Sequence, residues 1–175
     1  SSDLVTVSGV ETLTGSSGND TATLSATVSG MTVSLGAGTS DVLNLAAGTN
    51  SLSASGVETI VGSTGVDALT LTNAQSGTTV DLGAGTDTLT LAAGGNTVTV
   101  ANVESVVGGS GTDVVTLGAA GAVTVSGVET LVGSSGNDTA TLSGAVSGMS
   151  VDLGLGTNDI LNLAAGANSL SASKI

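Results

Sequence analysis

The chain has 175 residues, 28 of them glycine, and contains no proline, cysteine, histidine, tryptophan, tyrosine or phenylalanine. Fourteen acidic residues and a single basic one, Lys174, give a formal charge of −13. This charge excludes nucleic-acid binding, because nothing would neutralise the phosphates. No apolar run reaches the length of a membrane span, so membrane insertion is not expected. The apolar fraction of 39% argues against disorder, and the lack of aromatic rings favours a thin core repeated along an axis.

The predicted elements are short strands separated by glycine-rich turns. A strand over residues 3–7 (DLVTV) is followed by GVETL at 9–13 and by a first turn that ends at Asp20. Two alternating segments then lead to the turn that ends at Asp41, and three lead from there to Asp67. Alternation with period 2 and many β-branched residues predict strands throughout, with no helix. The later turns end at Asp87, Asp113, Asp138 and Asp159.

These turns recur at a nearly fixed period. Successive turn aspartates are 21, 26, 20, 26, 25 and 21 residues apart. Such a period is typical of a solenoid, in which each repeat is one coil stacked on the last. The sequence therefore predicts an all-β, parallel β-solenoid (a β-roll or β-helix) of about seven coils, alternating short and long, over residues 1–175 as a single array. Seven coils at about 4.8 Å each would form a rod roughly 33 Å long.

The sequence also contains a longer repeat that spans several coils. Val5–Ser55 aligns with Val123–Ser173 at an offset of 118 residues, and 42 of the 51 positions are identical. A block of several coils has therefore been duplicated. We interpret the chain as a segment of a longer repetitive protein and expect self-association, end to end or lateral, through open strand edges.

The turn aspartates are the main candidates for chemistry. Stacked coils would place them roughly 5 Å apart, and carboxylates that close need a counter-ion or raised pKa values. Hard oxygen ligands without nitrogen or sulfur donors favour calcium. The alternative is that each aspartate only caps its own turn by accepting backbone N–H groups.

The best-formed turn is GGSGTDVVTL, at Gly108–Leu117, and GSSGNDTATL and GSTGVDALTL are close variants of it. The form G-[GS]-x-G-x-D resembles the nonapeptide of RTX proteins, the hemolysin-type calcium-binding repeats. The resemblance implies a secreted β-roll with calcium held between turns of successive coils. Only one turn per coil matches, so it implies a single row of sites on one side. Its implied ligands are Asp20, Asp41, Asp67, Asp87, Asp113, Asp138 and Asp159.

Other polar residues receive structural interpretations. The glutamates of the GVET and NVES segments are predicted to be solvated, outward-facing charges: Glu11, Glu58, Glu104 and Glu129. Asp81 and Asp152 alternate with core positions and are predicted to lie on the surface. Five asparagines are predicted to stack as amide ladders at coil corners: Asn44, Asn50, Asn96, Asn162 and Asn168.

Three classes of function follow from this inventory. The first is an extracellular, calcium-stabilised structural module of a surface layer, filament or adhesin stalk. The second is a binding module for ice or another surface, suggested by the threonine-rich strands. The third is a polysaccharide-acting β-helix enzyme. We expect no enzyme and no small-molecule substrate, because His, Cys, Arg and Tyr are absent and the acids recur as equal repeats rather than as one acid–base pair.

Overall fold

A computed structural model describes residues 1–175, and it contains strands and turns only. No helix in it is long and apolar enough to cross a membrane. One sheet has ten strands: β1 (Leu4–Val7), β3 (Thr21–Leu24), β5 (Val42–Asn44), β7 (Thr59–Thr64), β9 (Ser76–Ala84), β11 (Thr97–Ala101), β13 (Val114–Leu117), β15 (Thr130–Val132), β17 (Ser147–Asp152) and β19 (Ser169–Ser173). The other has nine: β2 (Thr12–Ser16), β4 (Ser29–Gly36), β6 (Asn50–Ser55), β8 (Asp67–Leu71), β10 (Thr88–Thr90), β12 (Ser105–Val107), β14 (Ala122–Ser126), β16 (Thr139–Leu142) and β18 (Ile160–Asn162).

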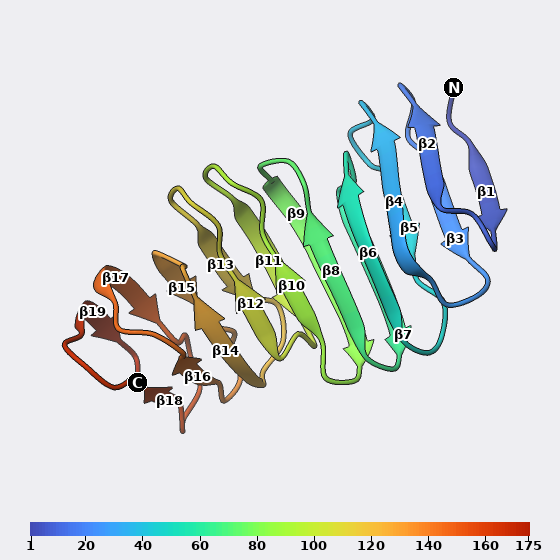
Figure 1. The fold of residues 1–175 in the computed structure, drawn as a ribbon. Helices are drawn as coiled ribbons and strands as arrows, with labels where there is room; N and C mark the ends of the chain where they lie inside the picture. Colours follow the sequence, from blue (N-terminus) through green and yellow to red (C-terminus); the bar gives the residue numbers. More distant parts are fainter.

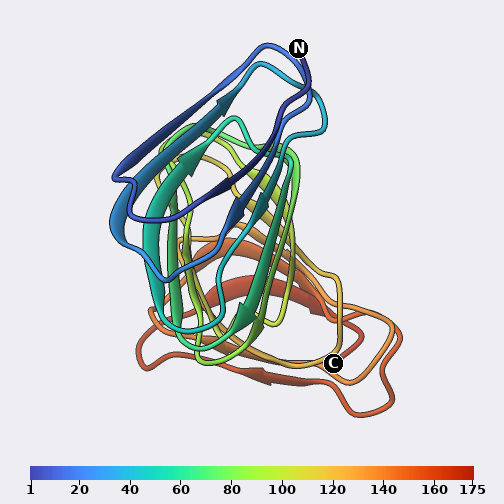
Figure 2. The ribbon, with the colours of Figure 1, turned by 90° about the vertical axis from the view of Figure 1, so that its right-hand side faces the viewer.

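The chain winds as a parallel β-solenoid, as predicted (Figure 1). Each strand pairs in parallel with the strand two further along, so one coil consists of two strands, one in each sheet. Seen along the rod, the central coils superpose as flattened loops (Figure 2). The prediction of about seven coils is close, but the ten-stranded sheet gives a rod of about 43 Å, nine spacings of about 4.8 Å.

The register shows why the coils are more numerous than predicted. Leu4 pairs with Thr21 and Thr21 with Val42, so these two coils have 17 and 21 residues. The shortest coil has 16 residues, from Val114 to Thr130. The short intervals between turn aspartates hold two strands, whereas the long ones hold three. A long interval is therefore one and a half coils, and it moves the next aspartate to the opposite side of the rod.

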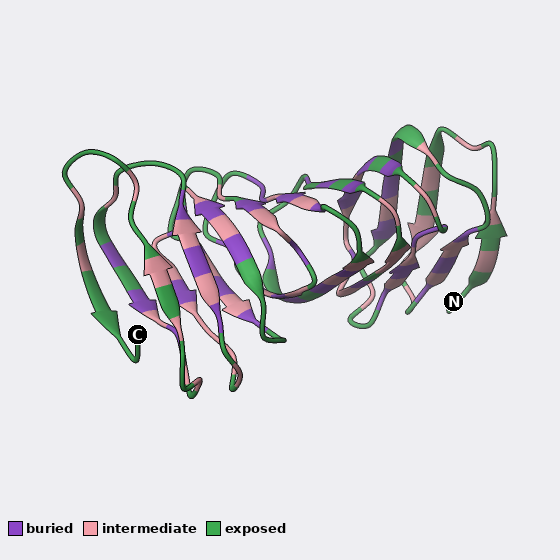
Figure 3. Ribbon diagram, turned by 90° about the horizontal axis from the view of Figure 1, so that it is seen from below, coloured by how far each residue is buried: buried purple, intermediate pink, exposed green.

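The core is a narrow layer of aliphatic side chains between the two sheets. Alternate residues of each strand point inward, and together with turn residues such as Val57 they form one buried cluster of 33 residues that includes Leu69 and Leu89. The alternation of buried and exposed bands along the central strands is visible in Figure 3. Small aliphatic residues suffice because the space between the sheets is only about two side chains deep.

The duplicated block is displaced by an odd number of strands. Strands β1 to β6 correspond to β14 to β19 at the offset of 118 residues, thirteen strands further along. Strand β3 lies in the ten-stranded sheet, while its duplicate β16 lies in the nine-stranded sheet. The two copies are therefore related by half a turn about the rod as well as by a shift along it.

Candidate metal site

The seven turn aspartates lie on both sides of the rod. We call side A the side on which the chain enters strands of the ten-stranded sheet, and side B the side on which it enters the nine-stranded sheet. Asp20, Asp41 and Asp113 precede or begin β3, β5 and β13 on side A. The prediction of a single row is wrong, because each three-strand interval crosses the rod. The aspartates on side B are Asp67, Asp87, Asp138 and Asp159.

The aspartate side chains point into the coil corners rather than outward. Asp41, Asp67, Asp87, Asp113 and Asp138 are completely buried by their surroundings. In three places a turn aspartate donates its backbone N–H to the carboxylate of the aspartate one coil later. These bonds run from Asp20 to Asp41 Oδ1 (2.6 Å), from Asp67 to Asp87 Oδ1 (2.7 Å) and from Asp138 to Asp159 Oδ1 (2.7 Å).

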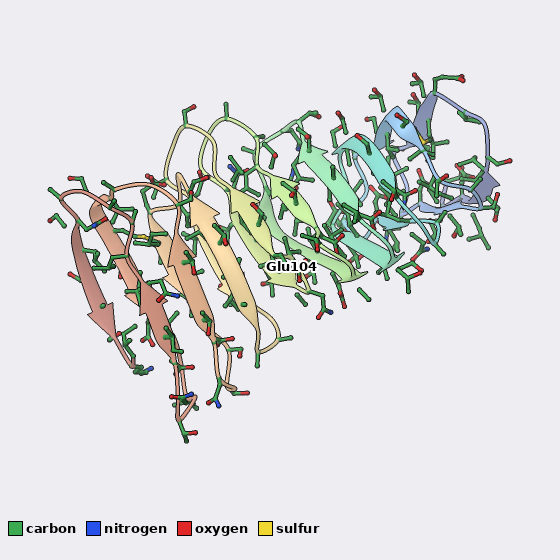
Figure 4. All side chains as sticks on the ribbon, turned by 60° about the horizontal axis from the view of Figure 1, so that its bottom comes forward. Glu104 is labelled. Atoms are coloured by element: carbon green, nitrogen blue, oxygen red, sulfur yellow. The ribbon has the colours of Figure 1, made fainter.

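Three glutamates continue these ladders, so the prediction that they are solvated outward charges is wrong for them. Glu104, labelled in Figure 4, accepts the N–H of Asp87 through Oε2 at 2.7 Å. Their spacing of one coil from the preceding aspartate is a sequence signal that could have identified them. The other two bonds run from Asp41 to Glu58 (2.8 Å) and from Asp113 to Glu129 (2.9 Å). Glu11 is exposed, as predicted.

Two of the five predicted asparagines begin ladders, but none of the five bonds to another of them. Asn50 donates its N–H and its Nδ2 to Asp67 Oδ1, at 3.0 and 2.8 Å. Asn96 does the same to Asp113 Oδ1, at 3.0 and 2.7 Å. The predicted amide ladders are therefore mixed amide–carboxylate ladders. Of the other three, Asn168 accepts the N–H of Val146, while Asn44 and Asn162 donate to threonines on the strand faces.

The second carboxylate oxygen divides six of the seven turn aspartates into two groups, and Asp159, which is partly exposed, belongs to neither. In the first group Oδ2 accepts a backbone N–H of its own turn: from Ser16 to Asp20 (2.7 Å), from Gly109 to Asp113 (3.1 Å) and from Ser134 to Asp138 (2.7 Å). In the second group Oδ2 is buried and has no hydrogen-bond partner, at Asp41, Asp67 and Asp87. A buried polar atom without a partner costs about 1–3 kcal/mol, and more when it is charged.

Glycines allow carboxylate and carbonyl oxygens of adjacent coils to converge. A Cβ placed on Gly38 would lie 2.5 and 2.6 Å from the two carboxylate oxygens of Asp41 and 2.6 Å from the carbonyl oxygen of Gly18. A Cβ on Gly85 would likewise meet the carbonyl oxygen of Gly65 and Asp87 Oδ1. Only glycine leaves this space open.

These residues fit calcium, which takes six to eight oxygen ligands from carboxylates and backbone carbonyls. Beside Gly38 the unpaired Oδ2 of Asp41 and the carbonyl oxygen of Gly18 are present together, and beside Gly85 the Oδ1 of Asp87 and the carbonyl oxygen of Gly65 are. No three acidic side chains form a cluster that could hold a metal by themselves. Backbone carbonyls would therefore have to complete any site.

The pKa values of two turn aspartates are shifted in opposite directions. Burial raises the pKa of Asp87, and the negative charges of Asp67 and Glu104 add to this effect, against a stabilising N–H from Asp67. The N–H of Ser16 lowers the pKa of Asp20. Away from the turns, the N–H of Gly154 and the ammonium group of Lys174 lower the pKa of Asp152. Asp87 is therefore a buried carboxylate whose negative charge the protein itself compensates poorly.

Comparison with known proteins gives one match. Residues 5–26 and 123–144 match the family model of the RTX calcium-binding nonapeptide repeat (4 copies). The matched segments are duplicates of each other and together cover about a quarter of the chain. They confirm the predicted RTX-type repeat and calcium as its ion. No curated protein and no solved structure matches the chain.

Proposed function

We propose that this chain is an extracellular structural module, a segment of a stalk or filament that calcium stiffens. The observation that supports this function is the fold itself. Two unbroken parallel sheets run the length of the rod around one continuous aliphatic core. Calcium-binding repeats in a β-solenoid supply length and stiffness to a protein, and every coil here repeats the same plan.

Calcium would bind beside the carboxylates whose negative charge no basic residue of the protein neutralises. Fourteen acids against one base leave the carboxylate ladders without protein counter-charges. When bound, calcium supplies positive charge beside the carboxylates. The chain's own residues fix the geometry: backbone N–H groups orient Oδ1 of Asp41 and Asp87, and the neighbouring glycines let turn carbonyls approach. Ion binding free energy then becomes folding free energy.

An extracellular location agrees with this dependence. Calcium-binding modules that work outside cells tolerate dissociation constants of about 10⁻⁴–10⁻³ M, because the ion is abundant there. The chain has no cysteine whose redox state would matter. RTX-type repeats are typical of secreted bacterial proteins, and the matched segments are of this type.

Binding of an ordered surface such as ice is a second candidate, favoured by one observation. Outward hydroxyl side chains align in register across neighbouring strands of the nine-stranded sheet, from Thr12 and Thr32 through Ser53 and Thr70 to Thr90. The row ends at Val107. A face that is regular over five strands supports this function less well than the continuous rod supports a structural one. Shaping of ice crystals by the purified protein would favour it.

The experiment that tests the structural proposal compares the chain in millimolar calcium and in excess chelator. In calcium we expect strand-type circular dichroism and a radius of gyration of about 16 Å by small-angle scattering. In chelator we expect a lower melting temperature than in calcium, so that the strand signal is lost and the radius expands toward about 44 Å, the value for an unfolded chain of this length, at a lower temperature. An unchanged spectrum, radius and melting temperature in chelator, with no metal in the purified protein, would contradict the proposal.

A further inference from the structure

The seven turn aspartates are not equivalent, and their differences follow a pattern of tandem turns. In three places a turn of the form G-S-x-G-x-D is followed, one coil later, by a turn of the form G-x-G-T. The second turns begin at Gly36, Gly83 and Gly154. The paired aspartates are Asp20 with Asp41, Asp67 with Asp87, and Asp138 with Asp159, and each pair is joined by the N–H to Oδ1 bond described above.

The second turn of each pair gathers oxygen atoms from both coils. Beside Gly38, Gly85 and Gly156, a carboxylate oxygen of the second aspartate lies close to the carbonyl oxygen of a glycine in the first turn. The three carbonyls belong to Gly18, Gly65 and Gly136, each at the same position of its turn. This arrangement combines carboxylate and carbonyl donors, the set that calcium prefers.

The central pair has the greatest need for a cation. Both Asp67 Oδ2 and Asp87 Oδ2 are buried without a partner, and the two residues are fully buried. In the Asp20–Asp41 pair only Asp41 Oδ2 is unpaired, since Ser16 caps Asp20. A bound cation would supply these oxygens with the partner that the protein does not provide.

The Asp113 turn is the opposite case. It is the closest match to the nonapeptide, yet Asp113 Oδ1 accepts two hydrogen bonds from Asn96 and Oδ2 accepts the N–H of Gly109. One coil later the chain has the GVE segment of Glu129 and no second glycine turn. Its carboxylate is already satisfied by neutral donors.

We propose that this chain binds calcium at the three tandem turn pairs, most tightly between Asp67 and Asp87, and that the Asp113 turn is a hydrogen-bonded cap that binds no ion. This assignment rests on the proposed function, because it presumes that the repeats bind calcium. It places the tightest site outside both segments that match the RTX family model, residues 5–26 and 123–144. Three sites, on sides A, B and B, replace a row of seven.

Calcium titration of the purified chain, by calorimetry and by equilibrium dialysis, tests this assignment. We expect three bound ions. Asp87→Asn keeps an Oδ1 acceptor for the N–H of Asp67 but removes the charge, and it should weaken the tightest site by about 10-fold or more, since even supporting residues around metal sites contribute 10–100-fold. Asp113→Asn and the control Glu11→Gln, which removes an exposed charge away from the turns, should each leave three ions and unchanged affinities.

The outcomes separate this proposal from the proposed function. Seven ions, or a loss of affinity in Asp113→Asn equal to that in Asp87→Asn, would overturn the assignment while leaving a calcium-stabilised rod intact. No binding and no effect of chelator in any variant would overturn both. Should Asp87→Asn fail to fold, Asp67→Asn tests the same site, because Asp67 contributes the other unpaired oxygen.

Discussion

The turns that end at Asp87 and Asp113 have similar sequences, but their carboxylates differ in how far hydrogen bonds compensate the negative charge. Asp113 receives hydrogen bonds at both carboxylate oxygens from uncharged donors. Asp87 receives one, from Asp67, and lies between two further acids with an unpaired buried oxygen. A turn that matches the binding motif can thus have its carboxylate fully hydrogen-bonded within the protein, so similarity to the motif alone does not identify the carboxylates that need a cation.

The largest expected effect comes from closing the space beside Asp87. In Gly85→Ala the new Cβ would overlap the carbonyl oxygen of Gly65 and press on Asp87 Oδ1. Because backbone must shift, we expect a loss of about 3 kcal/mol in the free energy of unfolding, the upper end for overpacking, together with loss of the tightest calcium site. Denaturant unfolding in calcium measures the first and calorimetry the second.

Gly144→Ala is the matched control for that substitution. A Cβ on Gly144 meets no atom within 4 Å, and its backbone is not in the left-handed region. Its free energy of unfolding should change by no more than about 0.5 kcal/mol, as for other surface changes. A similar loss in both variants would mean that glycine flexibility, not the space beside Asp87, determines the effect.

A smaller effect is expected at the capped turn. In Asp113→Asn one carboxylate oxygen becomes an amide NH₂ group, which cannot accept a hydrogen bond. Either the N–H of Gly109 or the donors of Asn96 therefore lose their acceptor. We expect a destabilisation of about 1–3 kcal/mol, as for a buried donor left without an acceptor, and the same value in calcium and in chelator. A cost that appears only in calcium would show that Asp113 binds the ion and would reverse the comparison.

In chelator, the stability of the protein should depend on pH through Asp87. The folded-state pKa of Asp87 is raised, so its contribution to stability without calcium is greatest below the unfolded value of about 3.9 and falls as the pH rises through the folded value. In chelator, wild type should therefore lose stability relative to Asp87→Asn between about pH 4 and pH 7. Melting temperatures of the two proteins across this range test the sign, and a difference independent of pH would contradict it.

The smallest effect is expected from Glu104→Gln. The amide oxygen can still accept the N–H of Asp87, but one neighbouring charge is removed. In chelator we expect stabilisation of about 0.5 kcal/mol, the size of one partly exposed charge interaction, and a smaller dependence on pH. Glu129→Gln, next to the capped Asp113, serves as the control and should change neither quantity by as much. Thermal melts in chelator at pH 4 and pH 7 provide both measurements.

The sequence predicted the fold because period-2 alternation and regular turns directly specify parallel coils. It did not predict the side on which each turn lies. That depends on whether two or three strands separate successive aspartates, and the GVET segment could be read as an addition to a coil rather than as the start of strands such as β7 and β15. The prediction of an all-β solenoid does not depend on the number of strands between successive aspartates. The prediction of a single row of ligands does, because one extra strand moves the next aspartate to the other side of the rod.

The sequence also did not predict which carboxylate oxygens accept hydrogen bonds and which do not. Asp67 and Asp138 end turns of the same form, yet only Asp138 Oδ2 is capped, by the N–H and hydroxyl of Ser134. The difference arises from hydrogen-bond geometry within a turn and from what the preceding coil presents, Asn50 in one case and Gly121 in the other. No local pattern encodes that combination.

The duplicated block has a consequence for evolution by tandem duplication. A block of thirteen strands rotates its copy by half a turn, so whatever surface one copy acquires is displayed again on the opposite face without any new mutation. A duplication of twelve or fourteen strands would have produced a one-faced rod. Whether the duplicated block has an odd or an even number of strands thus determines where its surface recurs. With an even number the rod can contact partners on one face only, and with an odd number it can hold one partner on each of two opposite faces.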